Sequence, residues 1–243
     1  MKLDAPTPKH PKHIAIICDG NRRWARKQRL PAFMGHDHAV NNTIEELVNT
    51  GLEVGLEFMT FWIFSTENWN RDKAEIEWLM NLFRKMFDEK IEQYHQKGIR
   101  VLHIGNTAGL APDIQEKIEQ GVEKTKDNTK MTVVIAMNYG GRDEIVRASQ
   151  KMHAAIAAGE LTAEDISETT FAQFLDTAEI PDPDLIIRTS GEQRLSGFLS
   201  WQQQYSEFYF PEFDFPDFTG EELKKAIVEL QRRDRRFGGN SKK

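Results

Sequence analysis

The chain alternates between short, continuous apolar runs and longer segments in which apolar residues are spaced. The short runs are rich in β-branched and aromatic residues, which is typical of buried strands. We expect strands at 13–18, 56–64, 99–105, 131–137 and 184–189, with a shorter one at 206–210. Strands that are apolar on both faces are typical of a mostly parallel sheet with both faces covered.

Between these runs, apolar residues recur three or four positions apart, which predicts amphipathic helices. Asp72 with Glu75, and Thr219 with Glu222, have the spacing of a capping box, so helices are expected to begin there. The prediction is an α/β fold, with one domain over 1–243, helices flanking the sheet and a flexible N-terminus at 1–12. The spaced apolar residues are Val40, Ile44, Leu47 and Val48; Ile76, Leu79, Met80, Phe83 and Phe87; Ile114, Ile118 and Val122; and Leu223, Ile227 and Leu230.

Composition narrows the possible functions. The 243 residues carry a net charge of −6, which argues against general nucleic-acid binding. Cys18 is the single cysteine, and we find neither a secretory signal nor an apolar run near the roughly 20 residues that span a bilayer. We therefore expect a soluble, cytoplasmic protein. Its basic clusters, at 22–29 and 232–236, indicate a small anionic ligand.

Candidate chemistry follows the strands, because ligands of parallel sheets bind beyond the carboxyl ends of the strands. After the first strand come Asp19, Gly20 and a probable helix start with Arg22 and Arg23. A helix N-terminus beside guanidinium groups is a phosphate site, and Asp19 could hold a divalent cation bridged to the same phosphate. A solvated basic helix capped by Asp19 explains this stretch equally well.

Two further loops carry arginines. The segment 65–71 ends in Arg71, and taken alone it fits an ordinary capped turn. Arg188 and Arg194 flank Gly191, and the planar fork of arginine suits phosphate oxygens, although a salt-bridged surface loop is the alternative. The nucleotide and zinc fingerprints G-x-x-x-x-G-K-[ST], G-x-G-x-x-G and H-E-x-x-H are missing, which disfavours a P-loop ATPase, a Rossmann dehydrogenase and a zinc enzyme. The prolines around Asp182 and Asp184 indicate a turn.

The order of these motifs resembles the cis-prenyltransferase family, which contains undecaprenyl diphosphate synthase and related Z-prenyl diphosphate synthases. The resemblance runs from His13 to Gly239, and the D-D-x-x-D motif of trans-prenyl synthases is missing. The motifs that carry it are HIAIICDGNRRWA from His13, Gly35-His36, FSTENWNR at 64–71, NYGGRDEI at 138–145, DLIIRTSGEQRLSGFLSWQ at 184–202 and YSEFYF at 205–210.

The resemblance implies a homodimer that condenses isopentenyl diphosphate with an allylic diphosphate, farnesyl or geranyl diphosphate, into a Z-polyprenyl diphosphate. The implied steps are Mg²⁺-dependent ionisation, condensation and elimination. By the same resemblance Asp19 is catalytic and binds Mg²⁺, Asn68 assists proton removal, and Glu207 completes the metal site across the dimer interface. The implied substrate-binding residues are Gly20, Asn21, Arg22, Arg23, Trp24, His36, Ser65, Thr66, Glu67, Trp69, Arg71, Arg188, Arg194, Leu195 and Ser196.

These residues divide between two substrates. The resemblance assigns residues 20–23, His36 and Arg71 to the allylic diphosphate, and Arg188, Arg194 and Ser196 to isopentenyl diphosphate. It also implies a hydrophobic tunnel between sheet and helices for the hydrocarbon tail, and a peripheral membrane contact for product release. The ending Arg236-Phe237-Gly238 resembles the family's R-x-G tail, which reaches the partner subunit's site.

Some positions depart from the family pattern. Arg22 stands where bacterial undecaprenyl synthases usually have glycine, and residues 31–34 lack a basic residue often found there. Ile63 and Met137 occupy strand ends where long-chain members tend to have small residues, so a short or medium product is expected.

Two alternatives from other classes stay open. One is a non-catalytic cis-prenyltransferase-like partner subunit, but such subunits lack the catalytic motifs that this chain retains. The other is a nucleic-acid binder with a basic patch, whose binding would fall steeply with salt and need no Mg²⁺. The negative net charge and the clustering of arginines after strands argue against it.

Overall fold

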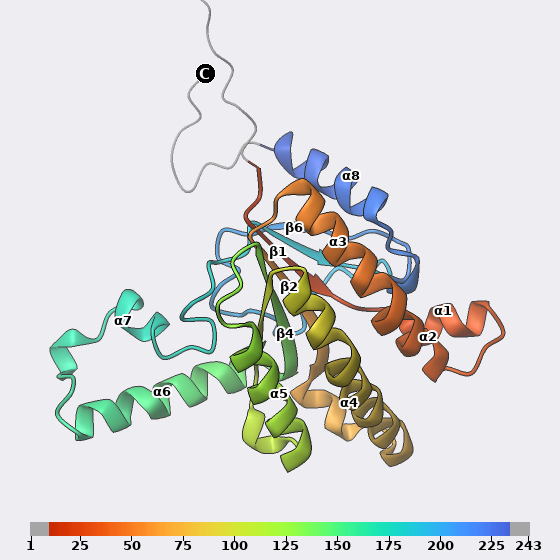
Figure 1. Ribbon diagram of the computed structural model, residues 1–243. Coiled ribbons are helices and arrows are strands. Elements are labelled where there is room, and N and C mark those ends of the chain that lie inside the picture. Colours follow the sequence, from red (N-terminus) through yellow and green to blue (C-terminus); the bar gives the residue numbers. More distant parts are fainter. Residues whose placement is uncertain (1–9, 234–243) are drawn as a thin grey trace, which may run out of the picture.

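The centre of the molecule is a six-stranded sheet in which every neighbouring pair of strands is parallel (Figure 1). The computed structural model describes residues 10–233. The order across the sheet is β3-β4-β2-β1-β5-β6, so β1 and β2 lie at its centre. The strands are β1 (His13–Ile17), β2 (Phe58–Ser65), β3 (Ile99–Ile104), β4 (Met131–Tyr139), β5 (Leu185–Arg188) and β6 (Glu207–Tyr209).

Helices connect the strands and cover the sheet. No helix within residues 10–233 is both long and apolar enough to cross a membrane. The α-helices are α1 (Asn21–Lys27), α2 (Phe33–His38), α3 (Ile44–Val54), α4 (Lys73–Gln96), α5 (Pro112–Thr125), α6 (Gly141–Ala157), α7 (Glu168–Ala172) and α8 (Gly220–Gln231); a π-helical turn, Ala39–Thr43, joins α2 to α3.

The predicted α/β fold with a parallel sheet is confirmed. All six expected strands are present, and their ends differ from the expected ones by at most two residues. The helices expected around Val48, Phe83, Ile118 and Ile227 correspond to α3, α4, α5 and α8. Asp72 caps α4 by accepting a hydrogen bond from the Ala74 backbone N–H (2.9 Å), and Thr219 caps α8.

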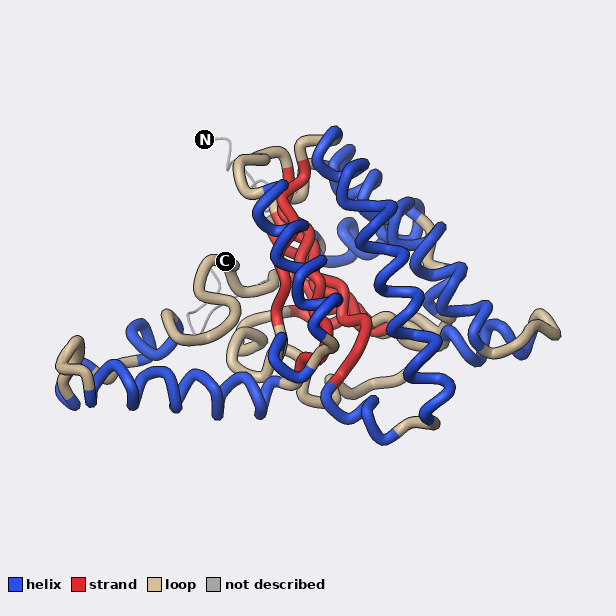
Figure 2. Tube along the Cα trace, turned by 60° about the horizontal axis from the view of Figure 1, so that its bottom comes forward, coloured by secondary structure: helices blue, strands red, loops and turns tan. Residues whose placement is uncertain are grey.

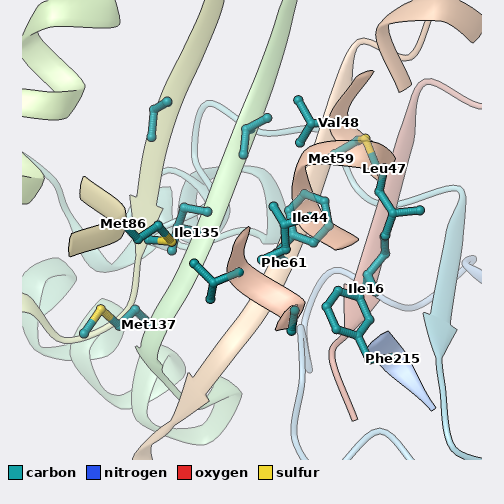
Figure 3. Packing of buried hydrophobic residues seen from close by; sticks show 14 of the residues in the cluster. Ile16, Ile44, Leu47, Val48, Met59, Phe61, Met86, Ile135, Met137 and Phe215 are labelled. Atoms are coloured by element: carbon teal, nitrogen blue, oxygen red, sulfur yellow. The ribbon is translucent and has the colours of Figure 1, made fainter. Parts of the chain in front are cut away.

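Side chains of each strand alternate between two cores, one on each face of the sheet. In β1, Ile14 and Ile16 belong to the larger core, whereas Ala15 and Ile17 belong to the smaller one. The larger core lies under α3, α4, α5 and α8, and Figure 3 shows part of its packing between strands and helices. The smaller core is closed mainly by an irregular segment, from which Phe198 stacks on Trp62 with ring centroids 4.9 Å apart.

The space expected to form a tunnel lies between α3 and α4. Ile44, Met86 and Ile135 fill much of it, as Figure 3 shows, together with Phe87 and Tyr94. The cavity that remains measures about 10 Å³, which is at the lower limit for one water molecule. A hydrocarbon chain would therefore enter here only if these side chains or the two helices moved apart.

Helix α6 was not predicted from the sequence; it begins after β4 and, together with α7, extends away from the body of the molecule (Figures 1 and 2). Buried polar contacts hold its first turns. Glu144 accepts hydrogen bonds from the Tyr139 hydroxyl (2.7 Å) and the Gln202 amide (3.1 Å). Arg147 donates two hydrogen bonds to Asp176, at 2.7 and 2.6 Å. These five residues are called the α6 network below.

The expectation of a flexible N-terminus at 1–12 is only partly within the described residues, which begin at residue 10. Lys12 is fixed there, because its backbone N–H donates to Asp184 (2.7 Å) and its carbonyl accepts from the N–H groups of Glu57 and Phe58. Asp184 also accepts from the His13 N–H (3.2 Å). The structural interpretation of Asp184 is therefore confirmed.

Candidate active site

Strands β1, β2 and β5 end at a pocket of about 420 Å³. Parallel strands place their carboxyl ends at one edge, so loops that are far apart in sequence meet there. The sequence-predicted residues that line the pocket are Asp19, Asn21, His36, Ser65, Glu67, Asn68, Arg71, Arg188 and Ser196. Ile17, Cys18, Trp62, Ile63 and Phe64 form the rest of its wall.

The ion pair between Asp19 and Arg188 lies at the centre of this edge. Ile17 of β1 is in register with Arg188 of β5, which brings the following Asp19 within reach. Arg188 Nη2 and Nε donate to Asp19 Oδ2 at 2.8 and 3.2 Å, and Nη1 donates to the Ser196 hydroxyl at 2.8 Å. The arginine side chain is 7% exposed and the aspartate 35%, so a fixed buried cation holds a carboxylate that still faces the pocket.

Gly20 makes the sharp turn from β1 into α1 possible. Its φ is 100°, and a Cβ at this position would lie 2.5 Å from Asp214 Oδ1 and 2.7 Å from Ser190 Oγ. Both the left-handed backbone and the lack of space therefore require glycine. The Gly20 N–H donates to Asp19 Oδ1 (2.7 Å), which orients the carboxylate.

The basic block that begins α1 is balanced by acidic residues from distant parts of the chain. Lys27 forms an ion pair with the fully buried Asp214 (2.7 Å). Arg23 donates to the Ser190 carbonyl (2.9 Å) and to Glu192 (3.1 Å), while its side chain remains 46% exposed. Part of this block therefore anchors α1 to the body, and Arg23 does not line the pocket wall.

A second group of charges surrounds His36. Glu75 of α4 pairs with Arg71 (3.1 Å) and with Arg22 (3.4 Å), which holds both guanidinium groups near the imidazole. Burial, followed by the repulsion of Arg71 and then Arg22, lowers the pKa of His36 to about 4. A neutral imidazole beside two cations favours an anionic ligand over a cationic one.

Two buried polar atoms of the pocket have no hydrogen-bond partner. These are His36 Nε2 and Asn21 Oδ1. Buried polar groups in proteins are nearly always hydrogen-bonded, so such atoms in a pocket indicate the place of a ligand. A phosphate ester, with metal or protonated oxygens, could satisfy both.

The 65–71 segment is at once a capped turn and part of the pocket. The Ser65 N–H donates to Asn68 Oδ1 (3.0 Å), and the reciprocal contact completes a capping box. Trp69 donates to Asn138 Oδ1 (2.7 Å) and packs on Phe64. Thr66 lies in a neighbouring cavity of about 380 Å³ rather than in the pocket itself.

Some predicted substrate-binding residues lie elsewhere. Trp24 donates to Asp217 (2.8 Å) and stacks on His38, with ring centroids 4.8 Å apart. Arg194 is 61% exposed and pairs with Glu192, and its carbonyl accepts a hydrogen bond from Arg188. Leu195 packs against the smaller core.

Glu207, the second predicted metal ligand, is not beside Asp19 in this chain. It begins β6, in register with Leu185 at the start of β5, whereas Asp19 follows the end of β1. The two carboxylates thus lie toward opposite ends of the sheet. Glu207 pairs instead with Arg233 (3.0 Å). The predicted R-x-G tail at 236–238 lies outside the described residues.

The pocket fits a metal that arrives with a phosphate ester. Within residues 10–233 no group of three or more His, Cys, Asp or Glu side chains could hold a metal ion. Mg²⁺ is commonly bound by one or two carboxylates together with substrate phosphates and waters. Asp19, which faces the pocket beside atoms that lack partners, provides one such carboxylate.

Asp214 and Glu75 were missed by the sequence reasoning. Both hold the basic residues around the pocket, and Asp214 also accepts from the Ser190 hydroxyl (2.7 Å). Glu75 was assigned only to helix capping. Neither has a local signal of its role, because the partners lie far away in sequence or across a helix boundary.

A parallel sheet whose carboxyl edge gathers arginines, a histidine with an unpartnered nitrogen and the Asp19 carboxylate is an arrangement suited to phosphate esters. Comparison with known proteins makes this specific. A family model described as putative undecaprenyl diphosphate synthase matches residues 17–238, and the chain belongs to this family.

Relatives with curated names cover nearly the whole chain. An isoprenyl transferase of Clostridium perfringens is 48% identical over 95% of this chain and 91% of its own length. A ditrans,polycis-undecaprenyl-diphosphate synthase of Micrococcus luteus, described as (2E,6E)-farnesyl-diphosphate specific, is 43% identical over 94% and 92%. These similarities identify the chain as a prenyl transferase.

Solved structures agree with the fold. Lavandulyl diphosphate synthase from Lavandula x intermedia, in complex with dimethylallyl diphosphate, superposes with a TM-score of 0.90 at 36% identity, covering 94% of this chain and 98% of that chain. A probable undecaprenyl diphosphate synthase from Campylobacter jejuni gives 0.79 at 33% identity, covering 95% and 99%.

Proposed function

We propose that the protein condenses isopentenyl diphosphate with an allylic diphosphate, such as farnesyl or geranyl diphosphate, to form a Z-polyprenyl diphosphate. The observation that carries this proposal is the Asp19–Arg188 pair, which lies in one pocket with Arg71 and with the unpartnered atoms of His36 and Asn21. One pocket thus combines a carboxylate for a metal with two groups of anion-binding side chains.

The allylic diphosphate would bind at the α1 side of the pocket. Its oxygens would accept hydrogen bonds from Arg71 and from the ring N–H of the neutral His36. Arg22, Arg23 and the start of α1 at Gly20 would add positive potential. Glu75, which now pairs with Arg71 and Arg22, keeps these arginines in position without burying them.

Isopentenyl diphosphate would bind at the β5 side. Arg188 and Ser196 already contact each other there (2.8 Å), so donor groups are oriented before the substrate arrives. Arg194 is exposed and would have to turn from Glu192 toward the substrate. Ser190 and Ser196 have φ values of 77° and 51°, a costly backbone conformation that is often kept at functional sites.

Mg²⁺ fits Asp19, which would hold it together with diphosphate oxygens. When bound, the metal would neutralise negative charge that develops on the departing diphosphate. The arginines act on the same charge, and fixed groups of this kind contribute most in the transition state.

The reaction would proceed by ionisation of the allylic C–O bond and attack by the isopentenyl double bond. Loss of a proton from the condensed cation then leaves the new Z double bond. Asn68, which accepts a hydrogen bond from the Ser65 N–H at the pocket wall, would assist proton removal. Trp62 and Phe64 form an apolar part of the wall that would shield the cation from water.

We propose a short or medium product. Ile63 lines the pocket, where its bulk would limit the growing chain. Met137 is fully buried in the larger core, so it would act from behind the wall and not by direct contact. The filled space between α3 and α4 supports the same conclusion.

We also propose a cytoplasmic homodimer in which Glu207 acts in the partner's site. In one chain Glu207 lies toward the other end of the sheet from Asp19, and β6 is the outermost strand on its side. The test is to mix inactive Asp19→Ala and Glu207→Ala chains and allow them to exchange subunits. If sites are shared, mixed dimers regain one intact site and activity returns; mixtures that stay inactive would contradict sharing.

The alternative of a non-catalytic partner subunit is not favoured. Asp19, Asn68, Arg71 and Arg188 all reach the pocket, and several of them are held there by specific hydrogen bonds. A subunit that served only to stabilise a partner would have no use for this arrangement.

The decisive experiment measures incorporation of radiolabelled isopentenyl diphosphate with geranyl or farnesyl diphosphate as primer, with Mg²⁺ or with a chelator. We expect Mg²⁺-dependent products from the wild-type protein and none from Asp19→Ala. Lys130→Ala, which removes an exposed charge far from the pocket, is the matched control and should keep full activity. Absence of product with every primer would refute the proposed function.

A further inference from the structure

The loop between α1 and α2 exposes large apolar side chains at the margin of the molecule. Leu30 is 40% exposed and Phe33 43% exposed. Phe33 rests on Trp78 of α4, with ring centroids 5.1 Å apart, but its remaining surface faces outward. Figure 1 shows α1, α2 and this loop at the right-hand edge, beyond the helices that cover the sheet. The segment 26–34 is called the α1–α2 tip below.

The stretch of sequence that contains these apolar side chains carries cations and no acidic residue. No acidic residue occurs between Asp19 and Asp37, although the chain as a whole has a net charge of −6. Five cations fall in this interval, namely Arg22, Arg23, Arg26, Lys27 and Arg29.

The pairing of these cations differs along the interval. Arg22, Arg23 and Lys27 have acidic partners in Glu75, Glu192 and Asp214. Within residues 10–233, neither Arg26 nor Arg29 forms an ion pair, and these two adjoin the exposed apolar side chains. The uncompensated charge is thus confined to the α1–α2 tip.

We propose that the α1–α2 tip docks on an anionic lipid surface. Basic residues near a negatively charged bilayer are each attracted by about a factor of five in affinity, and apolar side chains that enter the interface add to this. Leu30 and Phe33 would enter the interface while Arg26 and Arg29 contact lipid phosphates. A protein partner of ordinary composition offers no comparable reason for two unpaired arginines beside two exposed apolar residues.

This docking goes beyond the proposed reaction, because it requires neither substrate nor metal. It would also orient the molecule, since α2 continues from the tip to His36 at the pocket. The pocket would then lie near the bilayer, which suits a protein whose proposed product carries a hydrocarbon tail.

The test is flotation of the full-length protein with vesicles of phosphatidylcholine, with or without phosphatidylglycerol. We expect binding to the anionic vesicles that weakens as salt is raised, and little binding to phosphatidylcholine alone. Arg26→Gln with Arg29→Gln should weaken binding about 20- to 30-fold. Leu30→Ser with Phe33→Ser should abolish most of the vesicle binding that persists at high salt.

Matched controls change the same kinds of residue elsewhere. Lys130→Gln with Arg232→Gln removes two exposed cations, and Ile166→Ser with Val228→Ser removes two exposed apolar side chains. Both controls should bind like the wild type. Circular dichroism of every variant shows whether it is folded. Equal losses in tip and control variants would overturn the proposal, and so would a wild-type protein that ignores anionic vesicles; a protein partner would then be the better explanation of the tip.

Discussion

The pocket and the α6 network contain the same kinds of polar residue, yet their contacts differ. In the α6 network Glu144 accepts from the Tyr139 hydroxyl, the Gln202 amide and the Asp176 N–H, and Arg147 is doubly bonded to Asp176. There only Gln202 Oε1 lacks a partner, among the atoms described.

The pocket, in contrast, contains polar atoms without hydrogen-bond partners beside a group of cations. His36 and Asn21, whose Nε2 and Oδ1 atoms have no hydrogen-bond partner, line the pocket together with Arg71 and Arg188. A polar cluster that is satisfied within the chain stabilises the fold, whereas one with open bonding positions next to a cavity indicates a ligand. The predictions below follow from this difference.

Among the variants that test this difference, the largest effect on activity is expected at Arg71. Arg71→Ala removes a cation that would stabilise charge on the allylic diphosphate, and loss of such a group typically reduces catalysis by about 10²- to 10³-fold. The free energy of unfolding should change by less than about 1 kcal/mol, because the Arg71–Glu75 pair is partly exposed. Steady-state kinetics measure the loss of activity, and urea unfolding measures the change in stability. A large loss of stability would show that Arg71 is structural.

Arg147→Ala should lower the free energy of unfolding and leave the activity of the folded protein unchanged. It leaves the half-buried Asp176 without its bidentate partner, and breaking such a pair costs about 3 kcal/mol of stability. The folded fraction should keep the activity per molecule of the wild type. Urea unfolding and active-site titration distinguish this outcome from a catalytic role, which would lower activity without lowering stability.

Two buried histidines, one in the pocket and one outside it, should respond differently to an anionic ligand. Burial lowers the pKa of both His36 and His13 to about 4, but His13 bonds to Pro181 and Thr60 whereas His36 Nε2 is open. Pyrophosphate should therefore raise the pKa of His36 by about 1–2 units and leave that of His13 unchanged. NMR titration of the imidazole signals, with and without pyrophosphate, measures both; parallel shifts would contradict the assignment of the pocket.

The lowered pKa of His13 also determines how the stability of the fold changes with pH. The folded-state pKa of His13 lies below its ordinary value of 6.5, so the unfolded chain binds the proton first as the pH falls. Stability from this group is complete above about pH 6.5 and declines toward pH 4, by at most about 3 kcal/mol. A His13→Gln variant should show a shallower decline in urea unfolding over this range.

The smallest effect on activity is expected at Ile63. Ile63→Ala should lengthen the products and lower stability by about 1–2 kcal/mol, because the side chain is only partly buried at the pocket wall. Met137→Ala, in the packed core, should cost about 2–5 kcal/mol. Thin-layer sizing of dephosphorylated products checks the first; an unchanged product from Ile63→Ala would remove Ile63 as a determinant of length.

Local patterns in the sequence predict much of the fold and the location of the site. Continuous apolar runs such as that around Ile16 indicate buried strands, and parallel strands bring the loops after them to one edge. Helix α6 was missed because its buried face is narrow, with Ala148 and Met152 among few apolar contacts. The role of Asp214 and the position of Glu207 depend on long-range packing and register, which no local pattern contains.

The pairing of β1 with β5 has a consequence for how the protein is made. Ala15 pairs with Ile186, and Asp19 meets Arg188, across about 170 residues of chain. Contacts between such distant segments form late and slowly, because a long loop must be closed first. A ribosome must therefore synthesise more than three quarters of the chain before the two halves of the site can meet. Until then β1, an apolar strand at the centre of the final sheet, can pair with β2 but lacks β5 on its other side, and that side is exposed to aggregation or to binding by chaperones.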